Sequence, residues 1–125
     1  WGLALPRLSS PVRAVLWATS WEPGGDRRIA AGTTALDRYT LVSGDEMQTF
    51  AIRWREARAL LGRGGIVPCD GPEEARLAIE CWTYDPARLA DGDCADRLSL
   101  FLSLRDSRDE RIQKELAALL EGVPW

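Results

Sequence analysis

Histidine and asparagine are absent from the 125 residues of this chain, and Lys114 is the only lysine among sixteen basic residues. Imidazole is the side chain that normally changes charge between about pH 5 and 8, and it is the commonest metal ligand. Without it the chain cannot assemble a Ser–His–Asp triad, a Cys–His pair or a histidine-containing zinc site. We therefore expect a non-enzymatic protein with no cofactor and no bound metal, and leave an enzyme open as the less favoured alternative.

Cysteine is scarce, and long apolar runs are missing. The cysteines at positions 69, 81 and 94 form no CxxC pair, and an odd, sparse set of cysteines is typical of a reducing compartment. No apolar run approaches the roughly 20 residues that span a bilayer, and no signal-peptide pattern occurs. We therefore expect a cytoplasmic protein that does not enter a membrane. Because the chain begins with Trp1 and not with Met, its native start can lie further upstream.

What the chain does contain is typical of a globular protein. Its length fits a single domain over residues 1–125, either whole or as a fragment of a longer chain. Charged residues make up 28%, with a net charge of −3, and acids alternate with arginines along the sequence. Such a surface has no overall attraction for nucleic acid, so we do not expect this chain alone to bind it.

Helix and strand signals alternate in the first half. A serine–proline pair at 10–11, followed by apolar residues at helical spacing, predicts a helix over 11–21. A short run of strand formers predicts a strand over 38–43. Apolar residues then recur at i, i+3, i+4 and i+7, which predicts a helix over 45–62.

The clearest strand signal in the chain covers residues 77–84. Period-two alternation divides its side chains between two faces. One face carries Leu77, Ile79 and Cys81, and the other carries Glu80, Trp82 and Tyr84. Before it, residues 66–68 predict a short edge strand that ends in proline. After it, Asp85 and Pro86 predict a short helical turn.

The C-terminal part is predicted to be helical. Residues 97–104 fit both a strand and a buried helix, and the apolar period alone does not decide between them. Asp96 as a capping residue favours the helix. Ser107 and Glu110 form a capping box before a last amphipathic helix. Together the elements predict an α/β (or α+β) domain, with two C-terminal helices and a small sheet packed against helices. The sheet contains a βαβ-like unit over 38–84, whose two strands a right-handed crossover makes parallel.

Three motifs in the final third resemble a known pattern. They are Trp82-Thr-Tyr-Asp-Pro, Asp96-Arg-Leu-Ser-Leu-Phe-Leu-Ser-Leu and Asp109-Glu-Arg-Ile-Gln-Lys-Glu-Leu. Over residues 77–121 they resemble the C-terminal domain of winged-helix regulators and abortive-infection (type IV) antitoxins. This resemblance implies a regulatory or protein-interaction domain of a bacterial-type protein, acting beside a toxin or effector. It supplies no catalytic residue, and because no winged-helix pattern precedes it here, it does not imply DNA binding.

Two groups of side chains are candidate interaction sites. Glu80, Trp82 and Tyr84 place large aromatic groups with polar handles on one strand face, which is typical of interfaces unless a layer of helices covers it. Arg55 and Arg58 share the face of the predicted helix opposite its apolar stripe, where they are either solvated or in contact with an anionic partner. We expect a protein partner or self-association at these sites.

The enzymatic alternative is a divergent or degenerate nucleotidyltransferase-like enzyme that depends on a metal ion. Such enzymes follow a strand with a Gly-Ser turn and a helix, and place carboxylates on the next strand to hold Mg²⁺. Here Ser43 and Gly44 precede the predicted helix, Asp45 lies beside them, and Glu80 lies on the following strand. Asp45 and Glu80 are therefore the candidate catalytic residues of this alternative, although two-metal chemistry needs more carboxylates than these.

Overall fold

The computed structural model describes residues 10–22, 28–40 and 47–121. Their centre is a five-stranded mixed sheet in the order β2-β3-β5-β1-β4. The strands are β1 (Val12–Trp21), β2 (Ile29–Ala30), β3 (Gln48–Arg53), β4 (Ile66–Pro68) and β5 (Leu77–Trp82). The helices are α1 (Gly32–Tyr39), α2 (Trp54–Gly62), the 3₁₀ turn η2 (Pro86–Arg88), α3 (Arg97–Leu104) and α4 (Glu110–Glu121). The predicted α/β class is confirmed.

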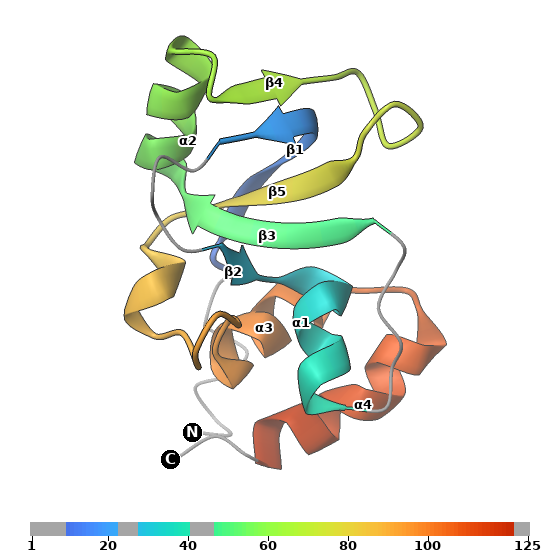
Figure 1. The fold of residues 1–125 in the computed structure, drawn as a ribbon. Helices are drawn as coiled ribbons and strands as arrows, with labels where there is room; N and C mark the ends of the chain where they lie inside the picture. The colour runs from blue at the N-terminus through green and yellow to red at the C-terminus, as the bar shows by residue number, and fades with distance from the viewer. Residues whose placement is uncertain (1–9, 23–27, 41–46, 122–125) are drawn as a thin grey trace.

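Helices cover the two faces of the sheet unequally. α2 packs on one face, where Ala57 and Leu60 join a buried cluster with Ile79 of β5. The other three α-helices, α1, α3 and α4, form a helical layer against the opposite face, around Trp82 and Leu100. Figure 1 shows this layer gathered beside β2 and β3, whereas β1 and β4 lie on the far side of the sheet. The second face is therefore covered near β2 and β3, and less so near β1.

The predicted helix over 11–21 is wrong, because these residues form β1. Two register irregularities, one near each end of the strand, explain the misleading spacing. A β-bulge inserts one extra residue, so that neighbouring side chains on one face lie three positions apart instead of two. Val12 and Val15 thus share one face, and Ala18 and Trp21 share the other. This spacing of three imitates a helix.

The next two predictions are also corrected. The first residues of the predicted strand 38–43 end α1, and residues 41–43 lie outside the described residues. Residues 45–46 of the predicted helix over 45–62 also lie outside the described residues, and from residue 48 the segment is β3 followed directly by α2, so only its second half is helical. β3 lies inside the sheet, with Ala51 and Ile52 both buried. A strand covered on both faces does not alternate between apolar and polar residues, and its apolar run therefore resembles a turn of buried helix.

The predictions for the second half agree better with the structure. β3 and β5 are parallel, which confirms the crossover, although its first strand is residues 48–53 and not 38–43. β4 lies at the sheet edge and ends in Pro68. β5 is confirmed but ends at Trp82, two residues before the end of the predicted strand. The helical turn after Asp85 is also confirmed, and that carboxylate accepts a hydrogen bond from the backbone N–H of Ala87.

Residues 97–104 are a helix, as the capping residue indicated. Asp96 Oδ2 accepts a hydrogen bond from the Ser99 backbone N–H at 3.0 Å. The capping box at Ser107 is wrong: α4 begins two residues later than the box requires, and its capping carboxylate is Asp109, which accepts from the Arg111 backbone N–H at 2.9 Å. Within the described ranges no helix has the length and apolar character needed to cross a membrane.

Candidate functional site

The two faces of β5 divide its side chains between the core and an open recess. Ile79 and Cys81 point into the cluster beneath α2. Trp82 lies on the opposite face and is fully buried under the helical layer. Glu80, two residues earlier on the same face as Trp82, lines a recess that opens on the sheet. This face of β5 is therefore covered by helices at Trp82 and lies open to the recess at Glu80, two residues earlier.

The recess has a volume of about 360 Å³, within the range of roughly 300–1,000 Å³ typical of ligand sites. We call its lining residues the open sheet face. They are Val15 and Trp17 of β1, Met47 and Thr49 at the start of β3, and Ala78 and Glu80 of β5. The strand register brings them together, because Trp17 and Thr49 both lie opposite Ala78 from the two neighbouring strands.

Glu80 is the one titratable side chain of the open sheet face. Its Oε1 accepts a hydrogen bond from Trp82 Nε1 at 3.0 Å. Burial raises the pKa of Glu80 above its usual value, and the hydrogen bond from Trp82 opposes that rise. Among the described residues, none forms an ion pair with Glu80 and none donates a hydrogen bond to its Oε2. The recess thus holds an acidic group that the fold itself compensates poorly.

The beginning of α1 lies against Glu80. Gly32 has a φ of 54°, and a Cβ at this position would lie 3.3 Å from Thr49 Cγ2 and 3.6 Å from Glu80 Oε2. Thr49 is fixed from both sides of its backbone: its N–H donates to Thr34 Oγ1 at 2.9 Å, and its carbonyl accepts from the Ala31 N–H at 2.9 Å. Glycine is therefore needed here for the left-handed backbone and for the close approach of α1.

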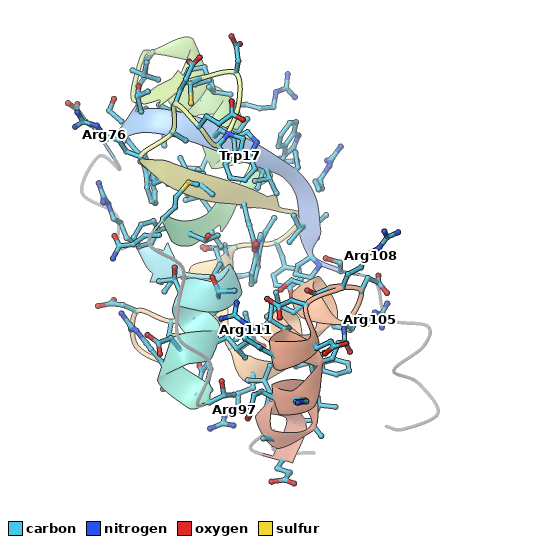
Figure 2. The ribbon with its side chains drawn as sticks, turned by 90° about the vertical axis from the view of Figure 1, so that its right-hand side faces the viewer. Trp17, Arg76, Arg97, Arg105, Arg108 and Arg111 are labelled. Carbon is cyan, nitrogen blue, oxygen red and sulfur yellow. The ribbon has the colours of Figure 1, made fainter. Side chains whose placement is uncertain are left out.

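The mouth of the recess is apolar. Val15 is 45% exposed and Trp17 is half-buried, and neither packs into the two buried clusters of the described residues. Val67 on the neighbouring edge strand is also 45% exposed. Figure 2 shows Trp17 on the sheet, above the part of the molecule that carries Arg97, Arg105, Arg108 and Arg111. Exposed large apolar side chains beside a recess are typical of an interaction surface.

The structure separates the three interface residues predicted on the strand over 77–84, of which Tyr84 lies beyond the end of β5. Trp82 is 0% exposed, and its ring meets that of Tyr84 edge-on with 5.6 Å between centroids. Tyr84 is half-buried and shares a hydrogen bond with Ser99 of α3. The interpretation that helices cover this face therefore holds at Trp82 and Tyr84, and the expectation that Trp82 meets a partner is wrong. Glu80 alone of the three lines the recess.

The other predicted site residues lie elsewhere. Arg55 and Arg58 are exposed on α2, as expected, but α2 covers the face of the sheet opposite the recess. Asp45 lies outside the described residues, so its pairing with Glu80 in a metal-dependent enzyme stays a prediction. Within the described part of the chain, no group of three or more Cys, Asp or Glu side chains is placed to hold a metal ion.

Val15, Trp17 and Thr49 line the recess but are not among the site residues predicted from the sequence. A strand interpretation of residues 12–21 would have revealed the first two, because β-branched and aromatic residues at alternate positions favour a strand. Thr49 is also not predicted, because it lies in the run over 45–62 that is predicted to be a helix. The aromatic wall of the recess therefore became visible only with the correct strand assignment.

Comparison with known proteins finds no relative: no protein-family model, no curated protein and no solved structure matches this chain. The resemblance of residues 77–121 to the regulator and antitoxin domain therefore stays a prediction. Function has to be argued from the geometry of the site.

Proposed function

We propose that this chain is a protein-interaction domain and that the open sheet face is its docking surface. The observation that supports this most is the exposure of Val15 beside Trp17, on a sheet face that the helical layer covers elsewhere. Burial of apolar area is the main favourable contribution to protein association, and aromatic anchors in central pockets supply much of it. The recess offers such a pocket next to an aromatic side chain.

The chemistry of the lining favours binding over catalysis. Five of the six lining side chains are aliphatic, aromatic, thioether or hydroxyl groups, and Glu80 is the sixth. General acid–base catalysis requires positioned groups that can exchange protons with a substrate, and it commonly pairs two of them. A single carboxyl among apolar groups instead resembles a site that recognises shape and charge.

Charge complementarity favours, as the partner, a polypeptide segment that is apolar and carries basic residues. The recess contains an acidic group without a basic partner in the described residues, and the whole chain carries a net charge of −3. Complementary charges raise the association rate and select among partners. An acidic segment would be disfavoured for the same reason.

A peptide selection tests this function. Random peptides displayed on phage are selected on the wild-type protein, and the affinities of the recovered peptides are measured on variants. We expect Val15→Asp and Trp17→Ser each to weaken binding by about tenfold or more, the size typical of an interface anchor. The double variant Arg55→Ala/Arg58→Ala is the matched control on the opposite side of the sheet, and it should bind as the wild type does.

Several outcomes would contradict the proposal, once circular dichroism has shown that the variants are folded. One is a library that yields no binder. Another is a set of peptides that bind Trp17→Ser as well as the wild type, or that lose affinity in the α2 control. A concentration-dependent dimer that Val15→Asp dissociates would show that a second copy of the chain, and not another protein, occupies this face.

A further inference from the structure

We propose that the Glu80 recess is a receptor for one basic side chain of the partner, a lysine or an arginine, whose charged head lies at Glu80 Oε2 and whose alkyl stem lies along Trp17. This inference rests on the proposed docking function and specifies its chemistry. It assigns Glu80 a role in binding. The alternative is a purely structural role, in which Glu80 only accepts the indole hydrogen bond of Trp82.

The arrangement around the carboxyl leaves one acceptor site free. Oε1 accepts the Trp82 N–H, whereas Oε2, 3.6 Å from where a Cβ on Gly32 would lie, has no donor among the described residues. A buried carboxylate is costly unless it is paired, and charge-assisted hydrogen bonds are about twice as strong as neutral ones. A cationic head would supply both the charge and the donors that the fold does not supply.

Trp17 provides the second element of a cation site. Elsewhere in this fold arginines lie over aromatic rings, at 4.6–5.5 Å from the ring centroid, as Arg28 does over Trp21. Within the described residues Trp17 has no such arginine and no aromatic neighbour in ring contact. Indole is the best aromatic acceptor for a cation. The ring beside Glu80 is therefore free to stack on the side chain of a partner.

No basic side chain of the described residues lines this recess. Arg76 precedes β5 on the same sheet, and Figure 2 shows its side chain directed away from Trp17. The recess is also larger than one basic side chain needs. Its remaining apolar wall, formed by Val15, Met47 and Ala78, can receive the residues that flank the basic one. An isolated amine should therefore bind weakly, and the same group within a peptide should bind more tightly.

The Trp82 indole N–H reports directly on this site, because it donates to Glu80. Its ¹H–¹⁵N resonance, assigned with Trp82→Phe, is followed while n-butylguanidinium, n-butylammonium or neutral n-butanol is added. We expect saturable shifts with one or both cations and not with the alcohol. The shifts should disappear in Glu80→Gln, which keeps an oxygen acceptor for the indole, and persist in Glu74→Gln, an exposed acid in the turn before β5.

The peptides selected for the docking function separate this inference from the function itself. We expect them to contain a lysine or arginine and to lose about tenfold or more in affinity for Glu80→Gln, as for a charge-assisted bond. Peptides that need Trp17, lack basic residues and bind Glu80→Gln equally well would overturn the receptor while leaving the docking surface intact. If the cations shift the resonance but the protein selects no peptide, the cation site is supported and the docking function is contradicted. Equal shifts with butanol would show an apolar recess only.

Discussion

The sheet face that carries Trp82 and Glu80 consists of a closed half and an open half. In the closed half Trp82 is fully buried, in the same cluster as Leu100 and Leu119 of the helical layer. In the open half Glu80 lines the recess together with half-exposed Val15 and Trp17. The two halves lie on the same strand, so strand propensity does not distinguish them. The position of the helical layer beside β2 and β3 does (Figure 1).

The largest expected difference concerns the two tryptophans. Trp82→Ala should destabilise the fold by about 3–5 kcal/mol, because it leaves a cavity in a packed core, and it also removes the hydrogen-bond donor to Glu80. Trp17→Ser should cost about 1 kcal/mol or less, since surface side chains contribute little to folding. Urea denaturation measures both. Equal losses for the two variants would show that Trp17 is part of the core and that the open half is not open.

A smaller effect is expected where the first residue of α1, Gly32, approaches Thr49 and Glu80. Gly32→Ala should destabilise the protein by about 1–2 kcal/mol, because its φ of 54° is unfavourable for residues with a Cβ. The added Cβ also presses on Thr49 at 3.3 Å. Gly62→Ala is the matched control, since no atom outside its own helix backbone and chain neighbours lies within 4 Å of its would-be Cβ and its φ is not positive. If both variants melt at the wild-type temperature, α1 does not depend on this glycine.

The acid of the open half should reduce stability at neutral pH. Burial raises the pKa of Glu80 above the value of 4.5 for the free side chain, so the folded protein keeps this proton to higher pH than the unfolded chain does. The contribution of Glu80 to stability is therefore greatest below about pH 4.5, and it falls as the pH rises through the interval between the unfolded and the folded pKa.

Glu80→Gln removes this titration. The variant should lose the decline and be more stable than the wild type near pH 7, by on the order of 1 kcal/mol. Unfolding free energies measured between about pH 4 and 8 give the difference curve directly. A wild type that gains stability relative to Glu80→Gln as the pH rises would mean that Glu80 is paired in the folded protein.

The smallest effect is expected at the rim of the recess. Val15→Thr preserves the shape and β-branching of a side chain that is 45% exposed, so its unfolding free energy should stay within about 0.5 kcal/mol of the wild type. Its affinity for selected peptides should nevertheless fall, because the hydroxyl replaces a methyl group in the docking surface. A loss of stability without a loss of affinity would show that Val15 contributes to folding and not to binding, which would contradict its place in the docking surface.

Some elements of the fold could be predicted from the sequence and others could not. Local signals predict β5 with its two faces, the edge strand that ends in Pro68, and helix α3, which Asp96 caps. The structure confirms these elements. Local signals do not predict β1 and β3, because bulges alter the spacing of the first and burial on both faces hides the alternation of the second. These two strands supply Val15, Trp17 and Thr49.

The candidate site was therefore predictable only in part. Glu80 stands out as an acid between large apolar residues of a strand, and it lies in the recess. Whether its neighbour on the same face, Trp82, is core or interface depends on helices that come later in the chain and pack against it. Strand period assigns the face of a side chain, but only the tertiary arrangement determines what covers that face.

The most direct test of the docking surface is a map of backbone amide shifts as the strongest selected peptide is added to the ¹⁵N-labelled protein. The account predicts that the largest shifts fall at Val15, Trp17, Thr49 and Ala78, with α2 unaffected. If the largest shifts instead surround Arg55 and Arg58 on α2, the docking surface lies on the opposite face of the sheet and the central claim is contradicted.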